Sequence, residues 1–256
     1  MMTIRTLGVA AALWCAPVWA ATIIVPDMNP SVRDAVMNAA PGDVIQVRAG
    51  IYFEPVRIED GQTGLVIEGL GEGRPILQLQ RRGDGISIRG VDGVTVRDFI
   101  VRGGTRGVRV EDANGVVIEH VASVAARQEA FLVKRASGTT LTAVEVDYSG
   151  GRGIRIDRAS ATTITGVAGA FGNGREGLRA DRALGLTVQS SVFGGNRGDG
   201  IRVHKSENVT LDGNVASGNG HSGIRVQASP PVASVTDLTN AGNAATGNGK
   251  ADFRAD

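Results

Sequence analysis

The chain is poor in cysteine and in large aromatic side chains, with one cysteine, two tryptophans and two tyrosines among 256 residues. A single thiol cannot close an intrachain disulfide, and a structural zinc site needs several cysteine or histidine ligands. The three histidines, His120, His204 and His221, do not share a metal-ligand spacing. We therefore expect no metal site, and we expect stability to come from apolar packing and backbone hydrogen bonds.

The chain also lacks a surplus of charge of either sign, with 27 Lys and Arg against 26 Asp and Glu. Nucleic-acid binding depends on a basic excess, so we predict no nucleic-acid partner. The apolar stretch over residues 7–19 is shorter than the roughly 20 residues that span a membrane. Cys15 is not preceded by the small residue expected ahead of a lipidated cysteine, so we expect no membrane anchor.

The first residues have the pattern of a secretory signal. Arg5 precedes the apolar stretch, and Ala20 follows Val18-Trp19 in a way that satisfies the small-residue rule for cleavage. We predict a signal peptide over residues 1–20, cleavage after Ala20, and a periplasmic or secreted mature protein. Cleavage there would remove the cysteine and both tryptophans, so stacking of sugar rings on indole is not expected.

A repeat dominates the rest of the chain. Seven segments share an alternation of apolar and polar residues, and their starts are 22, 23, 23, 24, 23 and 23 residues apart. The segments begin at Ile86, Val108, Phe131, Ile154, Leu178, Ile201 and Ile224. A fixed period in the low twenties, built from short alternating stretches, is typical of a solenoid in which one coil of chain stacks on the next.

One repeat unit, residues 201–223, contains three short alternating stretches separated by polar or glycine turns. Three strands per coil, stacked in parallel about 4.8 Å apart, would satisfy each other's backbone groups and bury a column of apolar side chains. An array of strand-helix repeats is the alternative, but the glycine-rich residues 194–200 form a poor helix. Gly177 and Gly200 each precede a strand, where we expect a tight turn.

Further positions support stacking and closure of the solenoid. Asn173, Asn196, Asn219 and Asn248 recur at one place in the repeat, which predicts an internal ladder of amide hydrogen bonds. Residues 29–40 predict a short helix that caps the first coil, with Asn29 as N-cap and Pro30 in the first turn. Residues 253–256 begin another coil whose strand has little visible cover, which indicates a partner, a contact with a second copy or a merely tolerated edge.

The front of the chain carries a family resemblance. The segments 39–54, with Pro41-Gly42-Asp43, and 65–71, with Gly69 and Gly71, resemble the entry to right-handed parallel β-helix proteins of the pectin-lyase-like superfamily. The resemblance implies an all-β, right-handed parallel β-helix, which the repeat extends to about 8–9 coils. The resemblance covers nearly all of the mature chain. We divide the sequence into a signal peptide at 1–20, a cap with the first coils at 21–63, and repeats at 64–256, with the last two ranges as one domain.

The resemblance implies less about activity. The superfamily includes pectate and alginate lyases, uronate epimerases, polygalacturonases, and periplasmic proteins that assist enzyme assembly. The Asp-Pro-His-Asp cluster of the alginate epimerases and the Asn-Thr-Asp signature of polygalacturonases are absent, so no catalytic residue transfers. Calcium enters by family analogy alone, and the cofactor stays open.

The outward face of the first strand in each repeat is the candidate working surface. Its first and third residues point inward, so the second and fourth point outward. The outward basic residues proposed to bind substrate are Arg155, Arg179, Arg202 and Arg225 in the second column, and Arg158, Arg182 and Lys205 just beyond the strand. Either each arginine pairs with a carboxylate two residues on, or the excess guanidinium groups bind carboxylates or sulfates of an acidic polysaccharide.

Lys134, Asp157, Asp181 and His204 occupy successive positions of the fourth column and are the candidate catalytic residues. Removing the proton beside a uronate carboxylate needs a base, such as His204 or Lys134, and a cation that neutralises the carboxylate. This predicts a polysaccharide lyase or carbon-5 epimerase. Carboxylates about 5 Å apart also suit a retaining glycosidase, but arginines that keep carboxylates ionised leave no proton donor. The rival hypothesis is a non-catalytic exported scaffold or assembly factor.

Overall fold

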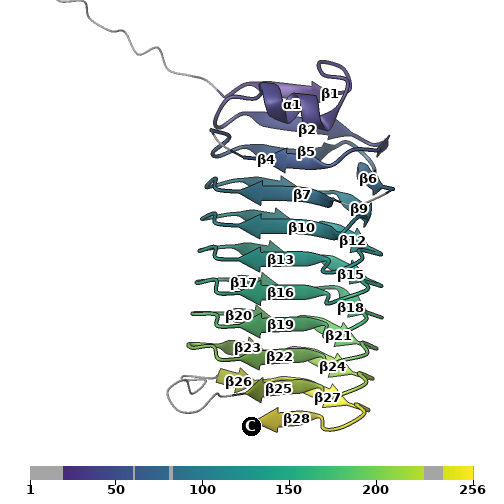
Figure 1. The fold of residues 1–256 in the computed structure, drawn as a ribbon, viewed down its shortest axis with the longest axis vertical. Coiled ribbons are helices and arrows are strands. Elements are labelled where there is room, and N and C mark those ends of the chain that lie inside the picture. The colour runs from purple at the N-terminus through teal and green to yellow at the C-terminus, as the bar shows by residue number, and fades with distance from the viewer. Residues whose placement is uncertain (1–19, 60, 81–82, 228–238, 256) are drawn as a thin grey trace, which may run out of the picture.

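Three strands recur in each coil, and each pairs in parallel with its equivalents in the neighbouring coils. The computed structural model describes residues 20–59, 61–80, 83–227 and 239–255. The coils stack along the long axis of the molecule from helix α1 to strand β28 (Figure 1). This arrangement confirms the predicted all-β parallel β-helix with three short strands per coil. Most of the predicted signal peptide lies outside the described residues.

The strands form three sheets, here called A, B and C. Sheet A contains β1 (Thr22–Val25), β2 (Val44–Arg48), β5 (Val66–Leu70), β8 (Thr95–Arg97), β11 (Val117–Glu119), β14 (Thr140–Thr142), β17 (Thr163–Thr165), β20 (Thr187–Gln189), β23 (Thr210–Asp212) and β26 (Thr239–Ala241). Sheet B contains β3 (Ile51–Tyr52), β6 (Ile76–Leu79), β9 (Ile100–Gly103), β12 (Ala122–Val124), β15 (Glu145–Asp147), β18 (Gly169–Phe171), β21 (Val192–Gly194), β24 (Val215–Ser217) and β27 (Ala244–Thr246). Sheet C contains β4 (Val56–Ile58), β7 (Asp84–Arg89), β10 (Arg106–Glu111), β13 (Phe131–Lys134), β16 (Ile154–Asp157), β19 (Leu178–Asp181), β22 (Ile201–His204), β25 (Ile224–Gln227) and β28 (Phe253–Ala255).

The seven predicted repeat segments are strands of sheet C, and their register follows the sequence period. Ile154 is the Cα partner of Leu178, and Leu178 is the partner of Ile201. These inward side chains are fully buried in one continuous core that runs through the stack. Equivalent residues therefore stand directly above one another, so a column read from the sequence is a column in space.

Glycine before the strands of sheet C is required by close packing between coils. Gly177 and Gly200 have φ values outside the left-handed region. A β-carbon on Gly177 would lie 2.8 Å from the carbonyl oxygen of Gly200 and 2.8 Å from the Asn196 amide nitrogen. A β-carbon on Gly200 would meet the Gly223 carbonyl oxygen at 2.6 Å. The chain bends at both glycines, as predicted, but glycine is required there because the neighbouring coil, and not a left-handed backbone conformation, excludes a side chain.

The asparagine ladder is confirmed. The Asn173 amide donates to the Asn196 side-chain oxygen at 2.8 Å, and Asn196 donates to Asn219, and Asn219 to Asn248, at 3.0 Å each. Asn196 is buried, and its amide also donates to the Ala170 carbonyl at 2.8 Å. The ladder therefore satisfies polar groups inside the stack, where each unpaired group would be costly.

Helix α1 (Val32–Asn38) caps the first coil, as predicted, but its N-terminus differs from the expectation. Ser31 is the N-cap: its backbone is extended, and its hydroxyl accepts a hydrogen bond from the Asp34 N–H at 3.0 Å. The predicted cap, Asn29, instead accepts a hydrogen bond from the Asn38 amide at 3.1 Å. Val32 and Val36 are buried against the core. Of the helices in the described ranges, none is long and apolar enough to cross a membrane.

The close approach of coils at Gly177 can be tested by adding one methyl group. We expect Gly177→Ala to lower the free energy of unfolding by about 1–3 kcal/mol, the usual cost of overpacking. Gly50 is the matched control, because a β-carbon there meets only the Tyr52 ring, at 3.5 Å or more. Gly50→Ala should change stability by less than about 0.5 kcal/mol in urea unfolding. Equal losses for the two variants would contradict this account.

A second substitution tests the ladder. Asn196→Ala leaves the Asn173 side-chain amide and backbone N–H without their acceptor and the Ala170 carbonyl without the Asn196 amide, so we expect a loss of at least about 2 kcal/mol. Asn248→Ala removes a partly exposed member of the ladder, whose former partners reach water more easily. Its loss should be clearly smaller in the same urea titration. A larger loss of stability for Asn248→Ala than for Asn196→Ala would mean that the buried amides do not stabilise the stack as proposed.

Candidate functional site

The outer face of sheet C carries arginines that bind carboxylates of their own strand. Both Arg179 nitrogens Nε and Nη2 donate to Asp181, at 2.7 and 2.9 Å. Arg155 lies 3.7 Å from Asp157, and Arg109 is hydrogen-bonded to Glu111. Pairing between an arginine and the carboxylate two residues on is therefore present. Asp157 and Asp181 are only 4% and 7% exposed, so the carboxylates of these pairs are shielded from solvent.

A further column of charges lies two residues before each strand's first core residue, and the sequence analysis did not identify it. Its members alternate in sign from coil to coil: Asp84, Arg106, Glu129, Arg152 and Glu176. Arg106 contacts Asp84 at 3.3 Å and Glu129 at 3.1 Å, while Arg152 contacts Glu129 at 3.7 Å and Glu176 at 3.0 Å. We call this set the alternating column. Opposite charges at the repeat period were the signal that could have revealed it.

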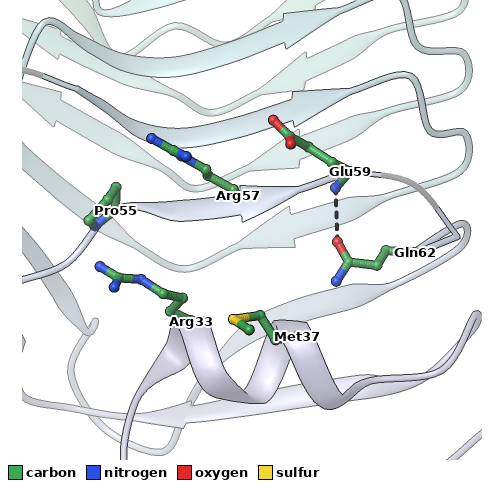
Figure 2. A pocket seen from close by; sticks show the side chains of 6 residues that line it. All are labelled: Arg33, Met37, Pro55, Arg57, Glu59 and Gln62. Carbon is green, nitrogen blue, oxygen red and sulfur yellow. Dashed lines mark hydrogen bonds between the residues drawn. The ribbon is translucent and has the colours of Figure 1, made fainter.

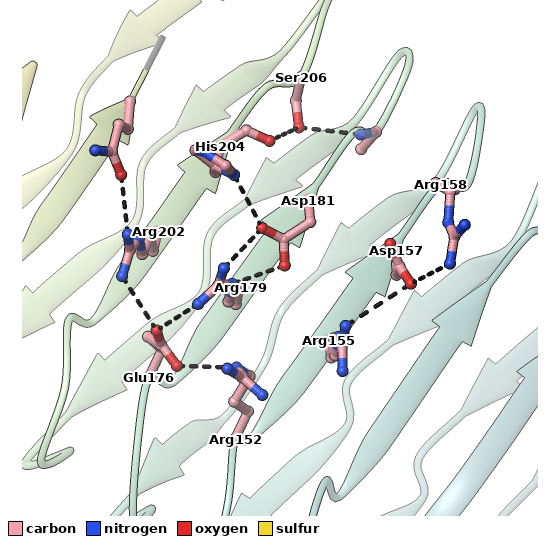
Figure 3. A network of polar contacts seen from close by, with 12 residues as sticks. Arg152, Arg155, Asp157, Arg158, Glu176, Arg179, Asp181, Arg202, His204 and Ser206 are labelled. Atoms are coloured by element: carbon pink, nitrogen blue, oxygen red, sulfur yellow. Dashed lines mark hydrogen bonds and ion pairs between the residues drawn. The ribbon is translucent and has the colours of Figure 1, made fainter. Parts of the chain in front are cut away.

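The alternating column connects to the arginines of the second column (Figure 3). Glu176 lies 3.3 Å from Arg179 and 3.6 Å from Arg202, in addition to Arg152. Arg202 has no carboxylate two residues on, because His204 occupies that position. It instead binds Gln227 at 2.9 Å. Arg179 and Arg202, both predicted to bind substrate, thus have internal partners, and Arg225 extends their column by one rung.

His204 and Asp181 are the predicted catalytic residues that the structure brings into contact. The His204 Nδ1 atom lies 3.2 Å from an Asp181 carboxylate oxygen, and Arg179 donates a hydrogen bond to each oxygen of that carboxylate (Figure 3). The Ser206 hydroxyl donates to the His204 carbonyl at 3.1 Å and accepts the Ala183 N–H at 3.0 Å. The His204 side chain is 25% exposed. Asp181 therefore orients the imidazole ring, Ser206 holds the backbone of His204, and part of the ring remains accessible to solvent.

Lys134 and Asp157 stand in the same column but have other partners. The Lys134 ammonium lies 3.0 Å from Glu111 on the preceding rung. Asp157 is the Cα partner of Asp181, and its carboxylate lies 3.2 Å from Arg158. The structure therefore places the four candidates on successive rungs, but it does not bring Lys134 to the His204 imidazole.

Two cations beside His204 have no side-chain ion pair or hydrogen bond to any residue that the structure describes. These are Arg182, which is exposed, and Lys205, which is partly exposed. The Arg182 N–H donates to the His204 carbonyl at 3.0 Å, and Lys205 follows His204 directly. Both residues adopt left-handed backbone conformations, with φ near 54° and 52°. Their charges are the ones that a ligand on this face would meet.

Electrostatics favour the ionised form of two buried carboxylates on this face, Asp181 and Glu111. Burial opposes ionisation of Asp181, but hydrogen bonds from Arg179 and His204 outweigh it and lower the pKa below its ordinary value of 3.8. The pKa of Glu111 is lowered likewise, because Lys134 and Arg109 outweigh burial. An ionised Asp181 can accept a hydrogen bond from His204 but cannot supply a proton to a glycosidic oxygen. This favours elimination over hydrolysis.

The residues of this face do not suit calcium. Calcium takes six to eight oxygen ligands. Asp157 and Asp181 are each bound by arginine and do not converge on a shared centre. Over the described ranges, no group of three or more His, Cys, Asp and Glu side chains is close enough to hold a metal ion.

Two hollows open on the surface near sheet C, and the sequence analysis found neither. One, of about 450 Å³, lies between α1 and β4 and is lined in part by Arg33, Met37 and Arg57 (Figure 2). The Gln62 side chain accepts the Glu59 N–H there at 2.8 Å. The other, of about 360 Å³, lies beside β16 and is lined mainly by arginine. Residues from different coils line each hollow, so no local motif marks them.

The fold defines a class of repeat protein, and the chain belongs to the right handed beta helix region family, whose model matches residues 84–248. This bears out the resemblance and the handedness predicted above. No protein with a curated function matches the sequence.

Solved structures of similar fold include proteins whose titles name an alginate lyase, a pectate lyase and an alginate epimerase. An alginate lyase from Paenibacillus sp. str. FPU-7 has a TM-score of 0.63 at 15% identity, covering 92% of this chain and 98% of that one. The pectate lyase Pel9A has a TM-score of 0.63 at 14% identity, covering 91% and 80%. The periplasmic alginate epimerase AlgG has a TM-score of 0.58 at 13% identity, covering 84% and 60%. At these identities the likeness shows the fold.

Acid should weaken the folded state through the lowered carboxyl pKa values. A carboxyl group whose pKa is lower in the folded state than in the unfolded state stabilises the fold. Its contribution is complete at pH values above the unfolded-state pKa and is lost as the pH falls through the folded-state pKa. We therefore expect the unfolding free energy to decline below about pH 4.5, the ordinary value for Glu111. Urea titrations at a series of pH values should show a shallower decline for Glu111→Gln than for the exposed control Glu72→Gln. An equal slope for the two variants would contradict this assignment.

Proposed function

We propose that the outer face of sheet C binds an acidic polysaccharide and that the protein is a polyuronate lyase or carbon-5 epimerase with His204 as the base. One observation carries the proposal. Arg182 and Lys205, which have no side-chain partner among the described residues, stand beside an imidazole that Asp181 orients at 3.2 Å. A base flanked by available cations is the combination that proton removal beside a carboxylate requires.

The chemistry follows from that geometry. With Nδ1–H of His204 donating to Asp181, the Nε2 atom has the free electron pair that accepts the C5 proton of a uronate. A guanidinium or ammonium beside the sugar carboxylate neutralises it and stabilises the negative charge that develops. In elimination, the C5 electrons form a double bond to C4 as the C4–O bond breaks, and the departing oxygen takes a proton from protonated His204 or from water. In epimerisation, the C4–O bond stays intact and water supplies a proton to C5 from the opposite side.

The contacts rank His204 above Lys134 as the base. The Lys134 ammonium is paired with Glu111 at 3.0 Å, and a paired ammonium retains its proton. Asp157 lies beneath Arg155 and Arg158, and we assign it the positioning of these arginines. Asp181 positions His204 in the same way.

The stack of coils suits an extended polymer. A chain lying along the solenoid axis meets a new rung about every 4.8 Å, and hence a repeated set of cations. The similar folds whose titles name alginate or pectate enzymes support a uronate polymer as the ligand. Such polymers lie outside the cytoplasm, and the predicted signal at residues 1–20 would deliver the protein there, to the periplasm or the medium.

The alternative is a non-catalytic scaffold or assembly factor, and one feature favours it. β28 is the last strand of sheet C, and no described strand pairs with its outer edge. Phe253 on this strand is 47% exposed. A partner strand, from another protein or from a second copy, would cover both. On this alternative the arginines of sheet C serve only the internal pairing described above.

Substitutions separate the two functions. We expect His204→Ala to abolish turnover of polyuronate while leaving binding and folding intact, because the imidazole contacts the reacting proton. Arg182→Gln combined with Lys205→Gln should weaken polyuronate binding about tenfold or more at low salt, since each charged contact is lost. Arg102→Gln combined with Arg197→Gln, which removes two exposed arginines, is the charge-matched control for the double change.

Turnover is followed by the ultraviolet absorbance of unsaturated uronates and by exchange of the C5 proton with solvent deuterium. Binding is followed calorimetrically at two salt concentrations. Binding without turnover would reduce the assignment to a binding module. Failure to bind any polyuronate at low salt would overturn the proposal and leave the scaffold function.

A further inference from the structure

We propose that the hollow beside β16, here called the arginine hollow, binds the carboxylate of a single uronic acid unit. This site rests on the proposed binding of an acidic polysaccharide to sheet C and names one of its subsites. The hollow measures about 360 Å³. Five arginines line it, from four successive coils: Arg106, Arg127, Arg152, Arg155 and Arg175.

Two adjacent glycines create the space. Gly150 and Gly151 occupy the turn before β16, and the equivalent positions carry Arg127 and Gln128 in the preceding coil. A β-carbon on either glycine would lie 2.6 Å from a carbonyl oxygen of that coil. No side chain therefore fits at these two positions, and a gap remains between Gln128 above and Arg175 below, whose N–H donates to the Gly151 carbonyl at 2.9 Å.

The charge inside the hollow is unbalanced. Glu129 is the one acidic residue of its lining, and it lies 3.1 Å from Arg106, 3.7 Å from Arg152 and 3.8 Å from Arg155. Arg127 and Arg175 are exposed, and neither makes a side-chain ion pair or hydrogen bond within the described ranges. Arg106, Arg152 and Arg155 also pair with carboxylates outside the lining, so the unbalanced charge of the hollow is that of Arg127 and Arg175.

Two further observations concern the buried arginines of the hollow. The Arg155 Nε atom is buried and has no hydrogen-bond partner among the described residues. The pKa of Arg152 is lowered, first by burial and then, against the attraction of Glu176, by repulsion from Arg179, Arg155 and Arg175. A bound oxyanion would accept hydrogen bonds from these groups and relieve their repulsion.

The position of the hollow indicates which oxyanion it takes. Arg155 belongs both to the hollow and to the second column of sheet C, in register with Arg179. A polymer lying on that face would thus pass beside the hollow, and a pendant carboxylate would meet planar guanidinium forks that match its shape. Inorganic phosphate or sulfate has similar oxyanion chemistry without the sugar, so the test compares these sources.

The test uses Arg127→Gln combined with Arg175→Gln, because both side chains are exposed and their loss leaves no described group unpaired. Arg102→Gln combined with Arg197→Gln is the matched control, since it removes two exposed arginines that do not line the hollow. Binding of a uronate trimer, inorganic phosphate and inorganic sulfate is measured calorimetrically at low salt. We expect the hollow variant to bind the trimer about tenfold more weakly or worse, and the control to bind it nearly as wild type does.

Each other outcome overturns the proposal in a distinct way. If the trimer binds equally to wild type and hollow variant but weakly to Arg182→Gln with Lys205→Gln, the subsite is wrong and the proposed function stands. If phosphate or sulfate binds wild type as tightly as the trimer does, and the hollow variant loses it, the hollow holds a free anion and not a sugar carboxylate. If wild type binds no uronate, the proposed function and this subsite both fail.

Discussion

Parallel stacking in register is the constraint on which the rest of the structure depends. Each side chain stands one rung, about 4.8 Å, from its equivalent in the next coil, so identical residues become neighbours. This suits asparagine, whose amide donates to one neighbour and accepts from the other, as Asn196 does. The same stacking is unfavourable for charged residues, because equivalent side chains of like charge would repel each other. The alternating column resolves the conflict by placing Arg106 and Arg152 on either side of Glu129.

The candidate site lies where this internal pairing is incomplete. Arg179 binds Asp181 through two hydrogen bonds and is largely occupied by it. One rung further, histidine replaces the acid, so Asp181 also orients His204 while Arg202 turns to Gln227. At Gly150 and Gly151 side chains are lacking altogether, and two of the surrounding arginines, Arg127 and Arg175, have no side-chain partner among the described residues. The repeat thus provides a rigid scaffold, and departures from it provide the groups that can meet a ligand.

The sequence was sufficient to predict the features that depend on period alone. The strands of sheet C, the asparagine ladder and the neighbouring positions of Asp181 and His204 all follow from equal spacing of equivalent residues. Features that depend on contact distance were not predictable in this way. Ser31 competes with Asn29 as N-cap through one hydroxyl contact, and Gly177 is needed because of a carbonyl in another coil. The arginine hollow combines residues of four coils, so no stretch of sequence contains it.

The central claim is that an acidic polysaccharide lies along the outer face of sheet C. The most direct test is a crystal structure of the protein with a bound uronate oligomer. The account predicts that the oligomer runs across the strands of sheet C, with sugar carboxylates in hydrogen-bond contact with Arg182 or Lys205 and a C5 atom facing His204. An oligomer bound to sheet A or sheet B, or only at the edge of β28, would contradict it.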